Sequence, residues 1–370
     1  MSLQDLSQNV RRYRLAKRLS QSALHKAAGI SLPAIKSLEA AKSEPRVRTV
    51  EAIARALDVP LRDLLLPVHR LQTVRFRSAK KMQNRENILA DAGRWLDEFN
   101  FLEGLLQEKN PYLLKGERGA NTPDGIIRTA CKCREKLGLD VSEPIYDICG
   151  LLEHGGVKVY PLVSSSEGFF GLSIGKEDGG PAIVVNVNER IPVERRIFSA
   201  VHELGHLVLH KDAFDVNESK EDKQEEKEAD LFAGHFLMPD RGFIKEWNEA
   251  AGLPLIDRVF KVKRVFRVSY KVVLHRLIEH RATNDSIWMR FTAAYEKRTG
   301  QKLAFKEEPR AIESAEPFGL ESYDFYEDRF SRLVRRAIDE NAISLGRGAE
   351  LLRIPLLEMR ELVRNWEAVR

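Results

Sequence analysis

Two histidines and one glutamate occur close together, in the order His202-Glu203-Leu204-Gly205-His206. Residues four apart lie on one face of an α-helix, so both imidazoles can reach the same metal ion. Glu203 points to a neighbouring part of that face, where it can act on water without being a ligand. The same spacing also arises by chance in helices with two hydrogen-bonded histidines, so alone it is a hypothesis.

A catalytic zinc ion needs a third protein ligand and one open position. The stretch 226–239 is typical of a second helix, and it ends at Pro239. It places Glu226 and Asp230 on one face, which suits a ligand carboxylate and an acid that orients a ligand histidine. We therefore favour Glu226 as the third ligand and predict that Asp230 supports one of the histidines.

Two other residues remain candidates for the third ligand. Glu228 follows shortly after Glu226 but faces another side of the helix. His210 lies one turn beyond His206, although this stretch lacks the glycine and third histidine of the pattern H-E-x-x-H-x-x-G-x-x-H. His235 faces away from Glu226, so we expect it to have a core or surface role.

The elements that position these residues indicate a mixed helix and sheet domain. Residues 197–210 have the apolar spacing of an amphipathic helix. Strand-like patterns precede this helix in three short segments, 157–160, 169–174 and 182–187. Glycines between residues 175 and 180 suit a hairpin turn, so we expect a small antiparallel sheet directly before the metal helix. Asn186, at the end of the last strand, is expected to cap a turn.

Taken together, the two helical motifs resemble the ImmA/IrrE family of metallo-endopeptidases. That family has H-E-L-G-H followed by E-x-x-A-[ND]-x-F-A-x-x-L-[LM]-M-P. The second motif is present as Glu226, Ala229, Asp230, Phe232, Ala233, Leu237, Met238 and Pro239. The chain departs from the pattern at Phe236, where the family usually has leucine.

The resemblance implies a zincin-like domain whose Zn²⁺ ligands are His202, His206 and Glu226, with Glu203 as the catalytic base. It also implies that an edge strand of the sheet holds the substrate as an added strand. The implied substrate is a protein, typically a repressor that regulates stress genes or a mobile element.

The length and composition of the sequence limit the class of protein. A chain of 370 residues suggests two or three domains. No apolar stretch approaches the length of a membrane span and the N-terminus lacks a signal region, so no membrane partner is expected. Cys131, Cys133 and Cys149 form neither a disulfide framework nor a C-x-x-C zinc motif, and we expect a cytoplasmic protein.

Charge is unevenly distributed along the chain. The net charge is +5, but residues 1–80 contain 16 Lys and Arg against 6 Asp and Glu, a net of +10. The rest of the chain therefore carries −5. A basic N-terminal module on a mildly acidic body predicts double-stranded DNA as a partner.

Residues 5–66 are expected to form five short helices. Ser20 and Ser31 are suitable N-caps for the second and third, and Gly29 closes the second. This stretch resembles the XRE-type helix-turn-helix domains of phage repressors. The chain departs from that family at His25, which replaces a small alanine, and at Ala41, which replaces a glycine that needs a positive φ.

By this resemblance, the third helix would lie in the major groove. The residues expected to face bases are Ser31, Leu32, Ala34 and Lys36. The residues expected to contact phosphates are Gln21, Lys42 and Arg46.

Between the two motif-bearing regions, residues 68–150 are expected to be a helical connecting region. Its basic run is expected to be a solvated linker and consists of Arg70, Arg75, Arg77, Lys80 and Lys81. Three helices should follow, near residues 87–106, 122–137 and 145–154. The acidic stretch 212–230 is also expected to be a solvated connection.

The resulting prediction is a mostly helical α+β protein with four parts. They are an N-terminal five-helix domain (1–67), the connecting region (68–150), a metallopeptidase domain (151–284) and a C-terminal helical, helix-turn-helix-like domain (285–370). We expect a DNA-binding regulator with zinc-dependent endopeptidase activity that cleaves a regulatory protein, and the sequence allows a homodimer. The alternative is an antitoxin-like transcriptional regulator whose metal site is structural or sensory.

Overall fold

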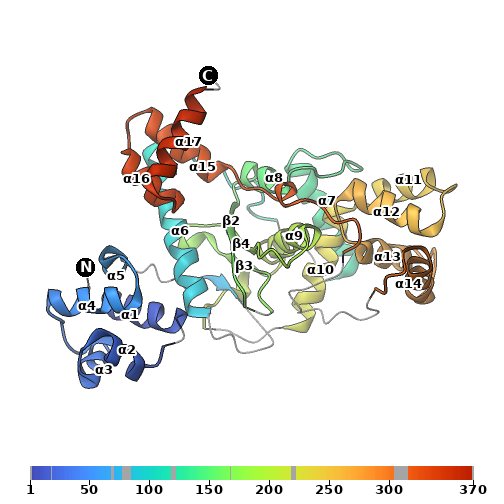
Figure 1. Cartoon of the computed structure of the whole chain (residues 1–370). Helices are drawn as coiled ribbons and strands as arrows, with labels where there is room; N and C mark the ends of the chain where they lie inside the picture. The colour runs from blue at the N-terminus through green and yellow to red at the C-terminus, as the bar shows by residue number, and fades with distance from the viewer. Residues whose placement is uncertain are drawn as a thin grey trace. The chain divides into compact units, whose positions relative to one another are not determined.

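The computed structural model describes residues 2–17, 19–67, 71–76, 85–117, 122–166, 168–217, 222–303 and 316–368. These residues fall into two compact units. The first comprises the described residues up to Leu71 together with 85–97, and the second comprises 72–76 and the described residues from Glu98 onward. The fold is mostly helical with one small sheet, which confirms the predicted α+β class (Figure 1). No helix among the described residues is long and apolar enough to span a membrane.

The first unit begins with the five predicted short helices. They are α1 (Leu3–Ala16), α2 (Gln21–Ala28), α3 (Leu32–Glu39), α4 (Val47–Leu57) and α5 (Leu61–Leu65). The hydroxyl groups of Ser20 and Ser31 accept hydrogen bonds from the backbone in the first turns of α2 and α3. Gly29 closes α2 with φ +66°, and Ala41 has φ +53°, the positive value that the sequence indicated.

In the second unit, the described residues form a four-stranded sheet in the order β1-β3-β4-β2. The strands are β1 (Val74–Arg75), β2 (Lys158–Leu162), β3 (Gly171–Ile174) and β4 (Ala182–Asn186). β3 is antiparallel to β1 and β4, whereas β2 is parallel to β4. The predicted wholly antiparallel sheet was therefore wrong. β3 follows β2 in sequence but does not pair with it. The chain returns from β3 through residues 175–181, which include a short 3-10 helix (Lys176–Asp178), and β4 then lies between β3 and β2 and runs in the direction of β2.

The prediction of a solvated linker was wrong for Arg75. This residue of the basic run lies in strand β1, and both residues of β1 are buried. The Thr73 carbonyl accepts a hydrogen bond from the Gly175 amide at 2.7 Å, which extends the pairing with β3. Arg75 is therefore part of the sheet. The other residues of the run, Arg70, Arg77, Lys80 and Lys81, lie outside the described residues.

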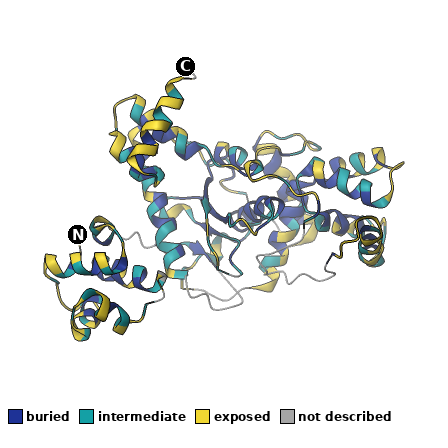
Figure 2. Ribbon diagram, in the orientation of Figure 1, coloured by how far each residue is buried: buried dark blue, intermediate teal, exposed yellow. Residues whose placement is uncertain are grey.

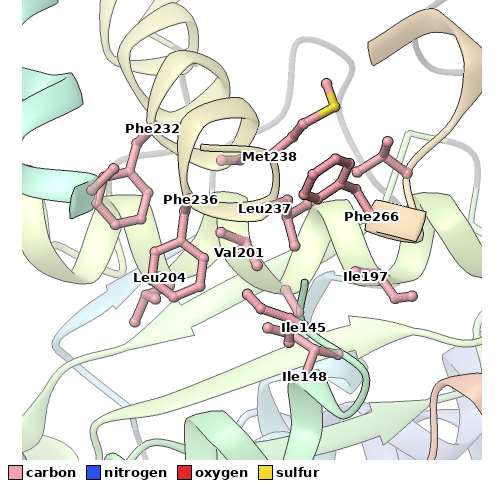
Figure 3. Close-up of a cluster of buried hydrophobic side chains, with 14 of the residues drawn as sticks. Ile145, Ile148, Ile197, Val201, Leu204, Phe232, Phe236, Leu237, Met238 and Phe266 are labelled. Atoms are coloured by element: carbon pink, nitrogen blue, oxygen red, sulfur yellow. The ribbon is translucent and has the colours of Figure 1, made fainter. Parts of the chain in front are cut away.

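Helices α9 (Val193–Leu209) and α10 (Lys223–Leu237) pack against each other beside the sheet, and α7 (Pro123–Lys136) packs against α10 (Figure 1). The strands and much of α9 are buried, as Figure 2 shows in dark blue. Figure 3 shows apolar side chains from α8 (Ile148–His154), α9 and α10 meeting in one cluster. Phe236, the departure from the family pattern, is completely buried there and stacks on Phe232 with ring centres 5.7 Å apart.

Four helices follow α10: α11 (Asp240–Glu249), α12 (Leu255–Phe266), α13 (Tyr270–Glu279) and α14 (Ser286–Thr299). Ile287, Phe291 and Tyr295 of α14 belong to the same apolar core as α9 and α12, although the sequence placed them beyond a boundary at 284. The buried ammonium of Lys263 contacts Glu194 at 2.9 Å and Glu316 at 2.5 Å. These contacts attach the segment that begins at Glu316 to the same core.

The C-terminal part contains α15 (Arg329–Asp339), α16 (Leu345–Leu352) and α17 (Leu356–Ala368), and it is helical as the sequence indicated. A buried ionic cluster connects α15 to the rest of the second unit. Glu103, from α6 (Arg85–Leu105), lies 2.8 Å from the guanidinium of Arg329 and 3.1 Å from the ammonium of Lys158. The carboxylate thereby connects α6, α15 and strand β2.

Candidate metal centre

Helices α9 and α10 bring His202, His206 and Glu226 together. One nitrogen or oxygen atom from each lies within 4.8 Å of the others. The Nε2 atoms of the two histidines are 3.0 Å apart. Glu226 Oε2 lies 3.2 Å from His202 Nε2, and Glu226 Oε1 lies 3.5 Å from His206 Nε2. Two imidazole nitrogens and a carboxylate are donors that Zn²⁺ prefers, so these side chains fit the metal ion.

The other ring nitrogen of each histidine has its own partner. His202 Nδ1 lies 2.8 Å from Asp230 Oδ1. His206 Nδ1 lies 2.9 Å from His210 Nδ1, and His210 Nε2 lies 2.9 Å from Glu228 Oε2. If Glu228 accepts the proton of His210, then His210 accepts one from His206 Nδ1. Nε2 of His206 is then left with its lone pair toward Glu226, an arrangement typical of metal-binding histidines.

This geometry separates the three candidates for the third ligand. Glu226 faces both Nε2 atoms. His210 instead contacts Nδ1 of His206, on the other side of the ring, and Glu228 contacts His210. His235 is buried elsewhere, and its Nε2 lies 2.8 Å from a guanidinium nitrogen of Arg276. Of the two roles expected for His235, in the core or at the surface, this position corresponds to the first.

The electrostatics of the cluster keep Glu226 ionised. Burial alone would raise the pKa of Glu226, but the hydrogen bond from His202 holds that pKa well below its usual value. Burial lowers the pKa of His206 well below its usual value. Burial also disfavours the charged form of His202, but hydrogen bonds with Asp230 and Glu226 outweigh it and raise the pKa of His202 to about 10. The shifts of Glu226 and His202 share one cause, the close contact between this carboxylate and this imidazole.

Glu203 lies beside this cluster and faces strand β3. The side-chain hydroxyl of Ser173 donates a hydrogen bond to Glu203 Oε2. Burial raises the pKa of Glu203 to about 7. A Cβ atom on Gly171 would lie 2.9 Å from Glu203 Cγ, so the absence of a side chain there makes room for the glutamate. Neither Gly171 nor Ser173 was predicted as a site residue, although small residues at two alternate positions of one strand were a signal in the sequence.

Arg75 was also missed, and no pattern in the sequence pointed to it. Its Nη2 atom lies 2.9 Å from Glu226 Oε1 and 3.0 Å from Glu225 Oε2. Arg75 is paired with Ser173 across β1 and β3, and cross-strand partners project from the same face of a sheet. Arg75 on β1 thus contacts the candidate ligand Glu226, and Ser173 on the adjacent β3 contacts the candidate base Glu203.

Asn186 has a structural role at the end of β4. Its carboxamide accepts hydrogen bonds from the amides of Ser164 and Asn188, at 3.0 and 3.1 Å. It also donates to the carbonyl groups of Ser164 and Phe169, both at 2.9 Å. The side chain fixes the loop that leads into β3, a wider role than the expected cap of one turn.

The predicted DNA-contacting residues lie on α2, α3 and the segments that flank α3. Ser31, Ala34, Lys36, Lys42 and Arg46 are exposed, and Leu32 is half-buried. Gln21 differs from them, because its amide group donates a hydrogen bond to Glu39 Oε2 at 2.7 Å. Arg14 contacts the same carboxylate through two nitrogens, at 2.6 and 2.8 Å. Gln21 is therefore engaged within the unit.

Comparison with models of protein families gives two matches. Residues 10–64 match the helix-turn-helix family, and residues 155–278 match the peptidase family described as the IrrE N-terminal-like domain. Both agree with the resemblances seen in the sequence. Among curated proteins, none matches the chain significantly. Strand β1, which carries Arg75, lies outside both matched regions.

Proposed function

Because the chain joins an XRE-type helix-turn-helix domain to a metallopeptidase domain of the ImmA/IrrE type, we propose that it is a DNA-binding regulator that cleaves another regulatory protein. The peptidase would be zinc-dependent, with His202, His206 and Glu226 as ligands. The observation that carries this proposal is the convergence of these three side chains within 4.8 Å, with the buried carboxylate of Glu203 beside them.

The proposed reaction is hydrolysis of a peptide bond. Zn²⁺, when bound, is a Lewis acid that polarises a carbonyl group and makes water more acidic. Glu203 accepts a proton from the attacking water and returns it to the leaving amine. A base acts best when its pKa lies near the working pH, and burial raises the pKa of Glu203 into that range. Ser173 holds the orientation of Glu203 through its hydroxyl group.

The proposed substrate is a repressor or another DNA-bound protein. The exposed polar side chains of α3 and its flanks, including Lys36, Lys42 and Arg46, are available for base edges and phosphates. A helix-turn-helix domain in the same chain would raise the concentration of the peptidase near proteins bound to the same DNA. The metallopeptidase fold alone does not define the substrate.

The proposal can be tested in cells that express either the full chain or its Glu203→Gln variant. New protein N-termini would be labelled and identified by mass spectrometry, and zinc content would be measured on both purified proteins. We expect about one zinc per chain in both and cleavage products only with the wild type. Products that persist with Glu203→Gln would overturn the role of Glu203. If the wild type binds DNA but yields no cleavage products in these cells, a regulator with a structural or sensory metal site would be favoured.

A further inference from the structure

The segment 72–76, which directly follows the helix-turn-helix unit in sequence, is firmly bound in the second unit. The amides of Gln72 and Thr73 donate to one carboxylate oxygen of Asp178, at 2.6 and 2.7 Å. The Gln72 carbonyl accepts a hydrogen bond from the Val216 amide at 2.9 Å. The ring of Phe76 lies 5.2 Å from that of Phe169. Backbone and side-chain contacts therefore fix the position from which Arg75 projects.

Arg75 is a buried cation inside the candidate metal centre, with a side chain that is only 2% exposed. It holds Glu226 through Oε1, whereas Oε2 is the carboxylate oxygen nearer to His202 Nε2. Fixing Oε1 in this way limits rotation of the carboxylate, keeps Oε1 within 3.5 Å of His206 Nε2 and directs Oε2 toward His202 Nε2. Hydrogen bonds to a ligand carboxylate commonly increase metal affinity by this means.

A positive charge near the ligands could instead repel a metal ion, so the two effects must be compared. Arg75 also contacts Glu225 at 3.0 Å, and Glu225 is not among the three convergent side chains. That second carboxylate offsets the charge of the guanidinium group without occupying a ligand position. Part of the repulsion is therefore offset, and we infer that the orienting effect on Glu226 outweighs the rest.

Removing Arg75 would also leave two adjacent carboxylates, Glu225 and Glu226, without the cation that lies between them. The two carboxylates would then repel each other with less compensation, because Arg75 is a buried cation that contacts both. Without this contact, Glu226 would be free to turn toward solvent, away from the position that the ligand set requires.

We propose that Arg75 is a positioning residue of the metal centre, and that the strand leaving the helix-turn-helix unit completes the site. This inference rests on the proposed function, because it takes Glu226 as a zinc ligand. Under this proposal, zinc affinity depends on the segment 72–76, which lies outside both regions matched by family models.

The test measures zinc affinity of the full chain by competition with a chromophoric chelator, for wild type, Arg75→Met and Arg276→Met. Arg276 is a matched control, because it is buried and pairs with the two carboxylates of Asp240 and Glu279 but contacts none of the three ligands. We expect Arg75→Met to bind zinc about 10 to 100 times more weakly than wild type. The control should stay within a few-fold of wild type.

Unchanged or tighter zinc binding by Arg75→Met would overturn the role of Arg75 and leave the proposed function standing. Absence of zinc binding by the wild type would instead overturn the metal centre itself. If Arg75→Met does not fold, Arg75→Lys keeps the charge and loses the planar fork. The visible spectrum of its Co²⁺ complex should then differ from that of the wild type, and an identical spectrum and zinc affinity would contradict the proposal.

Discussion

The hydroxyl group of Ser173 donates a hydrogen bond to the carboxylate of Glu203, which lies 30 residues further along the chain. The same hydroxyl lies 3.2 Å from the backbone carbonyl of Glu203. Strand β3 therefore contacts both the side chain and the backbone of the residue that we propose as the base.

Replacing Ser173 by alanine should reduce cleavage without removing zinc. The Glu203 carboxylate would lose its hydroxyl donor in a buried position, and an unmade hydrogen bond of this kind costs about 1–3 kcal/mol. We expect about a tenfold drop in the yield of cleaved product, measured against zinc content. Thr129→Val, which removes a buried hydroxyl on α7, is the control. An equal loss of cleaved product in both variants would show that removing any buried hydroxyl group lowers activity, and would contradict a specific role of Ser173.

Replacing Gly171 by alanine should displace Glu203, because the added Cβ would lie 2.9 Å from Glu203 Cγ and 3.0 Å from the Val184 carbonyl oxygen. Cleavage should fall while zinc affinity changes little. Gly234→Ala in α10 is the matched control, since a Cβ added there would meet no neighbouring side chain or segment within 4 Å. It should raise stability by up to about 1 kcal/mol. Full activity of Gly171→Ala would contradict the close approach.

Replacing His210 by alanine should weaken zinc binding by about tenfold or more, because His206 would lose the partner that fixes its ring. Glu228→Gln should have a smaller effect in the same direction, since an amide still contacts His210. Chelator competition measures both. An affinity equal to that of the wild type in His210→Ala would show that the Nδ1 contact does not support His206.

The helix-turn-helix residues should separate into two classes. Lys42→Ala and Arg46→Ala should weaken DNA binding at all sequences and reduce the slope of log affinity against log salt by about one each. Gln21→Ala should instead lower the melting temperature, because Gln21 supports Glu39 within the unit. Titrations of labelled duplex DNA at several salt concentrations, with thermal melts, distinguish the classes. A reduced salt slope without a loss of stability in Gln21→Ala would assign Gln21 to phosphate.

Stability should depend on pH through Glu316. Burial raises the pKa of Glu316 to about 7, although Lys263 acts in the opposite direction. A carboxyl group with a raised pKa favours the folded state at low pH, and this contribution is lost as the pH rises from about 4.5 to about 7. The melting temperature of the wild type, relative to that of Glu316→Gln, should therefore fall over this interval. A difference that stays constant with pH would contradict the shift.

The sequence predicted the elements whose signals are local. Caps at Ser20 and Ser31, the positive φ at Ala41 and the helix with two histidines are all set by neighbouring residues. It missed what depends on pairing between distant segments. β1 is two residues long and resembles a basic linker in sequence, since only its pairing with β3 buries Arg75. The parallel pairing of β2 with β4 is likewise set by the path of the chain between strands.

The short strand β1 also determines how the protein can be divided for experiments. A fragment that begins after residue 76 would leave the backbone groups of Ser173 and Ile174 on an open sheet edge. Open edges of this kind promote aggregation. Such a fragment would also lack Arg75, so its inactivity would say little about the intact chain. A truncated peptidase suitable for assays or crystallisation should therefore start at or before Leu71, even though the matched family region starts at residue 155.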